Sequence, residues 1–198
     1  MSTELSIIEQ VANSKYGLPS TSELLRTLLQ LEKNAKKETR EYGFANLEGC
    51  WNLRFITGTR KTRHRAGIVL GAGRYIPRLI KIKIHYENSS QSAVDTGRVK
   101  NQVQLGWLSL SLTGPVQFRS SKNILAFDFT YLEIMLLRFK LYSGYIKDGL
   151  ERETEFYNTK IKNQAFFSYF LIQDNAIAAR GKGGGLALWI RDDQSTTT

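Results

Sequence analysis

Apolar residues follow a helical period over the first part of the chain. Ser20 and Glu23 form a capping-box pair just ahead of the stronger stretch. A weaker amphipathic segment runs from Leu5 to about Ala12. The positions that share one helix face in the stronger stretch are Leu24, Leu25, Leu28, Leu31 and Ala35. The pattern predicts two helices before residue 43.

From about Gly43 onward, apolar and polar residues alternate, which is typical of half-buried strands. Side-chain parity reverses at Gly106, which predicts a bulge or a sharp bend there. The segment 147–162 is charged, without a strong apolar face, and predicts a loop or a frayed helix. Strands are predicted at 47–55, 76–86, 99–112, 124–131, 133–141, 166–172 and 186–190.

Two short helices followed by many strands exclude a doubly wound α/β fold, in which helices and strands alternate. Closure of an antiparallel sheet into a barrel removes exposed strand edges and is the economical solution. We expect a mainly β chain that forms an antiparallel β-barrel with N-terminal α-helices. Residues 1–42 would pack on the barrel as a helical segment, 43–191 would form it, and 192–198 would be a disordered tail.

Strand alternation also predicts which side chains point into the barrel. A binding protein would place apolar walls around its ligand there. In a small barrel the same side chains can instead fill the interior completely. The residues expected to face inward are Trp51, Leu53, Phe55, Ile82, Ile84, Val103, Leu105, Phe127, Phe129, Tyr169 and Leu171.

Positive charge is concentrated in one region of this chain of net charge +10. No Asp or Glu lies between Arg54 and Lys83. The loop that carries Arg60, Lys61, Arg63 and Arg65 should attract an anionic surface, and we expect a peripheral membrane surface. Nucleic acid is the rival partner, but no base-stacking motif or recognition helix accompanies the charge.

Candidate chemistry is sparse. The single cysteine, Cys50, excludes an internal disulfide, and with two histidines the chain offers little for a metal site. Lys182 is followed by glycines and a strand, so 180–185 is not a phosphate-binding loop. No grouping of nucleophile, base and acid stands out. We expect neither catalysis, nor a metal, nor a cofactor.

The sequence shows no targeting signal and no membrane-spanning segment. The first residues have no basic n-region followed by an apolar stretch. No segment approaches the ~18 apolar residues that a membrane-spanning helix needs. We expect a cytosolic chain or a mature form from which a targeting segment has been removed.

Two blocks of sequence carry a resemblance to a known family. Gly49 and Trp51 form the G-x-W pattern of lipocalin-type barrels, within the block Leu47–Gly58, LEGCWNLRFITG. The block Ala179–Trp189, ARGKGGGLALW, is the second. Together they resemble the opening strand and the closing hairpin of the fibrillin family, the plastid lipid-associated proteins. The chain departs from that family at 171–178, which lacks the first Asp of the family's Y-L-D-x-x-L-R-I segment and has Ile177 at its Arg position.

The resemblance implies a lipocalin-like barrel that binds a small apolar molecule, such as a carotenoid, quinone or lipid, without catalysis. Gly49 and Trp51 would seal one end, with Arg180 or Arg191 lying across the indole as a cation–π partner. The protein would be cytoplasmic or thylakoid-associated in a cyanobacterium. In a processed plant form it would lie in the plastid stroma or on plastoglobules.

Two alternatives remain open. A lipocalin-like bilin lyase acting on phycobiliproteins would use the same architecture, with acidic and arginine side chains in its cavity. A basic nucleic-acid-binding protein would use the positive charge directly.

Overall fold

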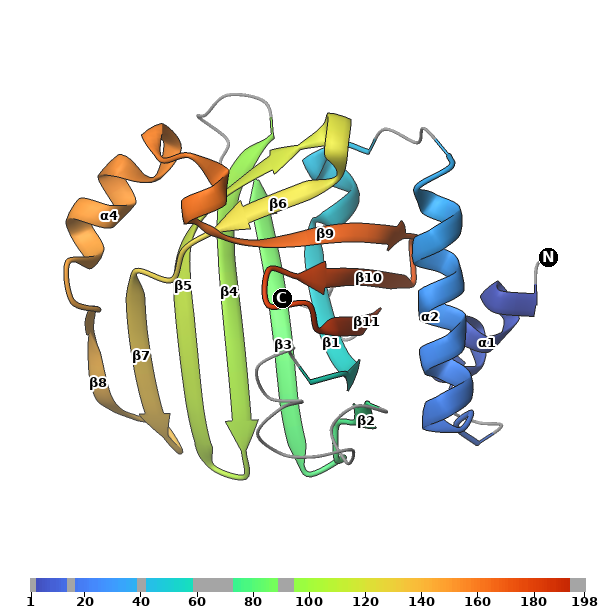
Figure 1. Cartoon of the computed structure of the whole chain (residues 1–198). Coiled ribbons are helices and arrows are strands. Elements are labelled where there is room, and N and C mark those ends of the chain that lie inside the picture. Colours follow the sequence, from blue (N-terminus) through green and yellow to red (C-terminus); the bar gives the residue numbers. More distant parts are fainter. Residues whose placement is uncertain (1–2, 14–16, 39–41, 59–72, 89–94, 193–198) are drawn as a thin grey trace.

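The structure, a computed structural model, describes residues 3–13, 17–38, 42–58, 73–88 and 95–192 (Figure 1). The helices and short 3-10 turns are α1 (Thr3–Asn13), α2 (Thr21–Ala35), η1 (Phe44–Leu47), η3 (Ser120–Lys122), α4 (Gly149–Glu155), η4 (Phe156–Asn158) and η5 (Ile161–Asn163). The strands are β1 (Gly49–Ile56), β2 (Arg74–Tyr75), β3 (Ile80–Asn88), β4 (Thr96–Leu105), β5 (Leu108–Arg119), β6 (Ile124–Phe127), β7 (Tyr131–Leu136), β8 (Phe139–Tyr145), β9 (Ala165–Ile172), β10 (Ala176–Gly181) and β11 (Leu186–Arg191).

Eight antiparallel strands close into a barrel, as the alternating pattern predicts. Hydrogen bonding follows the order β4-β3-β1-β11-β10-β9-β6-β5, and β5 pairs back to β4. Strand β5 has two partners on its other edge, since Leu108–Thr113 pair with β7 and Val116–Arg119 pair with β6. The β7–β8 hairpin therefore extends one wall of the barrel beyond the closed ring.

The N-terminal helices pack on the outside of the barrel (Figure 1). Ser20 caps α2, because its hydroxyl accepts a hydrogen bond from the Glu23 backbone N–H at 3.2 Å. Apolar side chains of both helices bury themselves against β1, β9, β10 and β11 in a cluster of Ile8, Val11, Leu24, Leu28, Phe55, Leu171, Ala176, Ala178, Leu186, Leu188 and Ile190. The helices cover the outer face of this wall.

A second cluster fills the barrel at the end where β1 begins. It consists of buried side chains from every part of the ring: Phe44, Leu47, Trp51, Ile84, Tyr86, Val99, Val116, Phe118, Leu125, Tyr169, Ile172, Ile177, Ala179 and Trp189. Phe44 N–H donates to the Asp95 carboxylate at 3.0 Å and fastens η1 over this end. This part of the interior is packed with side chains, which is the usual condition of a small barrel.

Two bulges change the predicted facing of side chains. Arg54 is the extra residue in the β1–β11 ladder, and Phe170 is the extra residue in the β9–β10 ladder. Each extra residue reverses the parity that follows it. Phe55 and Leu171, which we expected to face inward, consequently lie in the cluster under the helices.

Two turns also differ from the predicted elements. At Gly106, with φ at +56°, where a bulge or a sharp bend within one strand is predicted, the chain reverses in a two-residue hairpin turn between β4 and β5. The predicted strand 133–141 is divided at Leu137 and Arg138, where the turn from β7 to β8 has Leu137 at φ +56°. Both turns lie at the same end of the sheet, because Leu137 N–H donates to the Trp107 carbonyl at 2.8 Å.

Candidate functional site: the open end of the barrel

The inner face of one wall remains apolar beyond the packed interior. Strand pairing places its side chains in rows that cross β3, β4, β5, β7 and β8. The outermost row is Ile80, Leu105, Leu108, Leu136 and Phe139. The next row is Ile82, Val103, Leu110, Ile134 and Tyr142.

These rows are continuous with the barrel interior. Ile84 is the next inward residue of β3 and is buried in the packed cluster, and Val116 and Phe118 continue the inward parity of β5. Figure 1 shows why burial ends, since β3, β4, β5, β7 and β8 run past the level at which β6, β9, β10 and β11 cross them. The inner face thus emerges from the closed barrel as an open apolar surface, which we call the open face.

Exposure increases outward along the open face. Ile82, Val103, Leu110 and Ile134 are half-buried. Leu105, Leu108 and Leu136 in the outermost row are exposed, and Phe139 is 71% exposed. A contiguous exposed apolar surface on a folded protein usually marks a binding surface.

The opposite face of the same strands is mainly polar, with Met135 as an apolar exception. Lys81, Gln104, Ser109, Glu133 and Lys140 alternate with the apolar rows along their strands. The strands thus contain many polar residues, but the apolar side chains are concentrated on the inner face.

Nine of the eleven residues expected to line a ligand site lie in the packed interior, against it, or on the open face. Leu53, Ile82, Val103 and Leu105 are at or near the open face, whereas Trp51 and Ile84 belong to the packed cluster. Tyr169 also belongs to the packed cluster, and Phe127 and Phe129 pack against it with their rings 5.3 Å apart. Only Phe55 and Leu171 are on the wrong side of the wall.

The sequence does not single out the other residues of the open face, which are Ile80, Leu108, Leu110, Ile134, Leu136, Phe139 and Tyr142. Reading Gly106-Trp107 as a two-residue hairpin turn would have brought Leu108, Leu110 and Leu112 to the same face as Val103 and Leu105. The β7–β8 contribution depends on long-range pairing and has no comparable local signal.

The opposite end of the barrel is sealed by an arginine over a tryptophan. The guanidinium carbon of Arg191 lies 4.0 Å from the Trp51 ring centroid. The Trp51 indole N–H donates to the Leu47 carbonyl at 2.8 Å, and Nη1 of Arg191 donates to the Glu48 carbonyl at 3.2 Å. Arg191 is therefore the partner of Trp51.

Arg180, expected in that role, is on the outer side. Its Nε donates to Glu32 Oε1 of α2 at 2.6 Å, and its Nη1 donates to the Gly184 carbonyl at 2.6 Å. The hydrogen bond from Arg180 is the main cause that lowers the pKa of the Glu32 carboxyl below its ordinary value. Arg180 fastens the second helix to the barrel instead of sealing it.

Two phenols meet inside the packed interior. The hydroxyls of Tyr86 and Tyr169 are 2.8 Å apart, and both rings are fully enclosed. Burial is the main cause that raises the pKa of each phenol. Both stay protonated near neutral pH, so they act as a neutral hydrogen-bonded bridge between β3 and β9.

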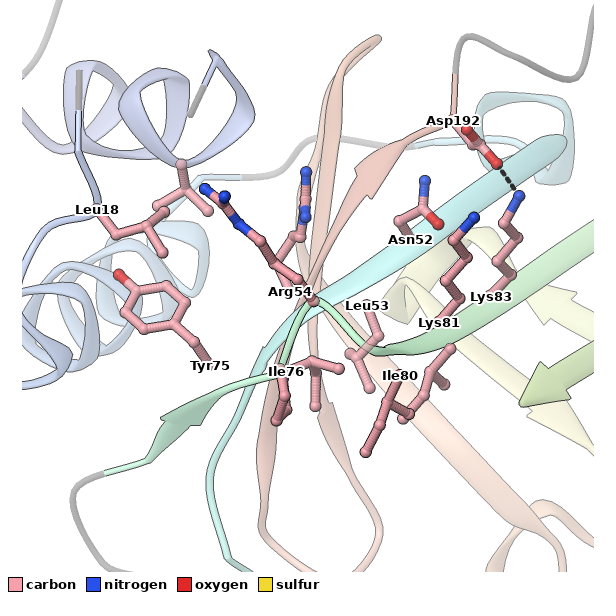
Figure 2. Close-up of a pocket in the computed structure, with 14 residues that line it drawn as sticks. Leu18, Asn52, Leu53, Arg54, Tyr75, Ile76, Ile80, Lys81, Lys83 and Asp192 are labelled. Carbon is pink, nitrogen blue, oxygen red and sulfur yellow. Dashed lines mark hydrogen bonds and ion pairs between the residues drawn. The ribbon is translucent and has the colours of Figure 1, made fainter. Parts of the chain in front are cut away.

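A pocket of about 330 Å³ opens through the wall beside the open face (Figure 2). Its apolar lining includes Leu53, Ile76, Ile80 and Ile82. Its polar lining includes Asn52, Arg54, Arg78, Lys81, Lys83 and Asp192. Tyr75 also lines it and donates its hydroxyl to the Pro19 carbonyl at 2.8 Å, and burial raises the pKa of Tyr75 to about 12.

Other predicted features lie elsewhere. The loop with Arg60, Lys61, Arg63 and Arg65 is outside the described residues. Cys50 is half-buried with its sulfur 3.9 Å from Asp192 Oδ2, and burial raises the pKa of its thiol, which makes it a poor nucleophile near neutral pH.

Across the described ranges, no three side chains of the metal-binding types gather closely enough to hold an ion. None of the helices seen there has the length and apolar character to span a bilayer.

Comparisons with known proteins leave the family open. No family model and no curated protein matches this chain. Among solved structures, a redesigned beta barrel is similar at 13% sequence identity and a TM-score of 0.36, over 79% of this chain and 100% of that one. Likeness at this level says nothing about function.

Proposed function

We propose that this protein binds a small apolar molecule on the open face and carries it without chemical change. The observation that supports this most directly is the pair of apolar rows that leave the packed barrel and become exposed. A carotenoid, quinone or lipid suits such a surface, since its binding free energy comes mainly from removing apolar area from water.

The same proposal includes docking on an anionic membrane. The open end has exposed apolar side chains at its turns, with Leu79 84% and Trp107 75% exposed. Exposed cations, Arg78 and Arg138, are adjacent to these turns in sequence. Apolar tips flanked by cations suit the boundary between anionic headgroups and acyl chains. A cargo could then move between the bilayer and the open face without crossing water.

The family assignment is part of the proposal. The arginine–tryptophan seal beside Gly49 agrees with the lipocalin-like reading, and the two sequence blocks that resemble fibrillins form β1 and the β10–β11 hairpin. We propose a fibrillin-type protein, associated with photosynthetic membranes in a cyanobacterium or plastid. The two rows of the open face contain no acidic or arginine side chain, so no observation there favours a bilin lyase.

Solvent extraction of the natively purified protein, followed by mass spectrometry, tests the cargo. We expect one apolar compound in stoichiometric amount from the wild-type protein, and its loss from a Leu110→Lys variant. Ser109→Lys is the matched control, because Ser109 is the neighbouring residue on the polar face.

An extract that stays empty after incubation with thylakoid lipids would contradict the proposal. Equal cargo in the Leu110→Lys and Ser109→Lys proteins would contradict it as well. Circular dichroism of both variants checks that the barrel is retained.

A further inference from the structure

We propose that the pocket between β1 and β3 binds the acidic headgroup of an amphiphilic cargo whose chain lies on the open face. This inference rests on the proposed function and names the chemical class of the cargo. The ligand would have one carboxylate or phosphate and one long apolar chain.

The pocket exists because two neighbouring strands separate. Strand β1 pairs with β3 only from Gly49 to Asn52, and the last paired residues are Asn52 and Lys83. Beyond that point β1 pairs with β2, through Phe55 and Tyr75, while the start of β3 pairs with β4 alone. The wall is thus open between Leu53 of β1 and Ile82 of β3, next to the open face.

The cations lie on one side of this opening, where Leu18 also lines the pocket, and the other side is apolar. Figure 2 shows Leu53, Ile76 and Ile80 on one side of the strands. Arg54, Lys81 and Lys83 extend from the other side, together with Asn52 and Asp192. Because Ile80 and Ile82 belong to the rows of the open face, a chain lying there can reach the cations through the opening.

Positive charge is in excess at this opening. Arg54, Arg78, Lys81 and Lys83 line it, and Asp192 is the one carboxylate among its described lining residues. Lys83 and Asp192 form an ion pair, so the negative charge is already engaged. An anionic ligand would balance the remaining cations.

Arg54 supplies an independent indication. Its Nε is buried and has no hydrogen-bond partner among the described residues. A buried donor without a partner costs free energy, and a bound acceptor removes that cost. Arg54 also follows Leu53 directly in β1, and both residues line the pocket. One strand can therefore contact a ligand with an apolar side chain and with a cation.

The headgroup class follows from these contacts. Carboxylates and phosphates accept charge-assisted hydrogen bonds from Arg and Lys, whereas an alcohol, an ester or a hydrocarbon end does not gain from the charge. A neutral isoprenoid would leave the cations unused. The structure therefore favours a fatty-acid-like or phosphatidate-like cargo over a carotene.

Fluorescence titration with cis-parinaric acid and with its methyl ester separates headgroup from chain. We expect the wild-type protein to bind the acid about tenfold more tightly than the ester, as one charge-assisted contact would give. Lys81→Gln and Arg78→Gln should each weaken binding of the acid several-fold and leave the ester unchanged. Lys100→Gln, an exposed lysine on the outer face of β4, is the matched control.

Displacement of the bound acid by palmitate or by lysophosphatidic acid distinguishes a carboxylate from a phosphate ligand. If the protein bound acid and ester with equal affinity, and both variants did the same, the headgroup site would be overturned. The proposal that the protein binds an apolar cargo would be unaffected. Absence of binding to either probe would instead overturn the proposed function, and the headgroup site with it.

Discussion

At the scale of single residues, Gly49 meets two requirements at once. Its φ is +112°, a region that residues with a side chain rarely adopt. A Cβ placed there would lie 2.6 Å from Nη1 of Arg191, which passes over this glycine to reach Trp51. The G-x-W pattern therefore has a physical basis here: glycine leaves room for the arginine that covers the tryptophan.

Gly49→Ala should destabilise the protein by about 2–4 kcal/mol, because backbone strain and displacement of Arg191 add together. Urea unfolding followed by Trp fluorescence measures the change. Gly106→Ala is the matched control, since Gly106 also has positive φ, +56°, but nothing lies within 4 Å of its Cβ position. Equal losses in the two variants would show that the arginine contact is unimportant.

The same residues show which features of the barrel can be predicted from local sequence and which cannot. Gly49 and Trp51 are recognisable from their spacing, but their partner is not, because the closing hairpin contains both Arg180 and Arg191. Phe55 and Leu171 were placed inward by strict alternation, and single extra residues at Arg54 and Phe170 reversed them. A bulge has no reliable local signal, so side-chain facing beyond it requires the structure.

At the scale of elements, α2 is held to the barrel by apolar contacts and by one ion pair. Arg180 and Glu32 approach through two nitrogens and two oxygens, and their side chains are 30% and 14% exposed. Bidentate geometry and partial shielding make this pair more favourable than an ordinary surface pair.

Glu32→Gln should lower the free energy of unfolding by about 1 kcal/mol near neutral pH. The hydrogen bond from Arg180 lowers the pKa of Glu32 in the folded state. The contribution of the Glu32 carboxylate to the free energy of unfolding is therefore fully present above the ordinary Glu pKa of about 4.3. It is lost as the pH falls through the lowered pKa of the folded state. Urea titrations from neutral to acidic pH should show the wild type and the variant converging in acid.

Glu151→Gln, at an exposed position of α4, is the control and should follow the wild type at each pH. A constant difference between the wild type and Glu32→Gln down to acidic pH would mean that the carboxylate charge contributes nothing to helix docking.

The elements themselves were largely predictable. Helix α2 and its cap, and strands β1, β3 and β9, follow from apolar period and capping chemistry. At Gly106 the pattern predicts a bulge or a sharp bend within one strand, whereas the chain turns back in a hairpin, and all of these devices reverse parity along the chain. Only pairing between strands distinguishes them, and pairing is a property of the fold rather than of the segment.

At the scale of the whole molecule, the division of β5 between two partners creates the open face. Its second half closes the barrel through β6, and its first half carries the β7–β8 hairpin away from the ring. Alternation predicted a closed barrel with a ligand inside it. The long-range pairing of β7 instead places the exposed apolar surface beside the opening, which local sequence patterns do not reveal.

Membrane docking at the open end gives a prediction with an internal reporter. Trp107 is 75% exposed, whereas Trp51 and Trp189 are 0% and 4% exposed. The emission of Trp107 should shift to the blue when vesicles containing phosphatidylglycerol are added, and much less with phosphatidylcholine alone. Phe139→Ser should weaken binding about tenfold, because burial of an apolar ring of this size in lipid contributes about 1.5 kcal/mol.

Leu150→Ser removes a leucine of similar exposure, 61%, from α4, which lies away from the open end in Figure 1. Its vesicle affinity should match the wild type if the turns of the open end make the contact. Equal weakening in Phe139→Ser and Leu150→Ser would mean that adsorption is unoriented, and an unshifted Trp107 emission in bound protein would place this end away from the bilayer. A shift confined to anionic vesicles and reduced only by Phe139→Ser would orient the open face toward the lipid from which a cargo would enter.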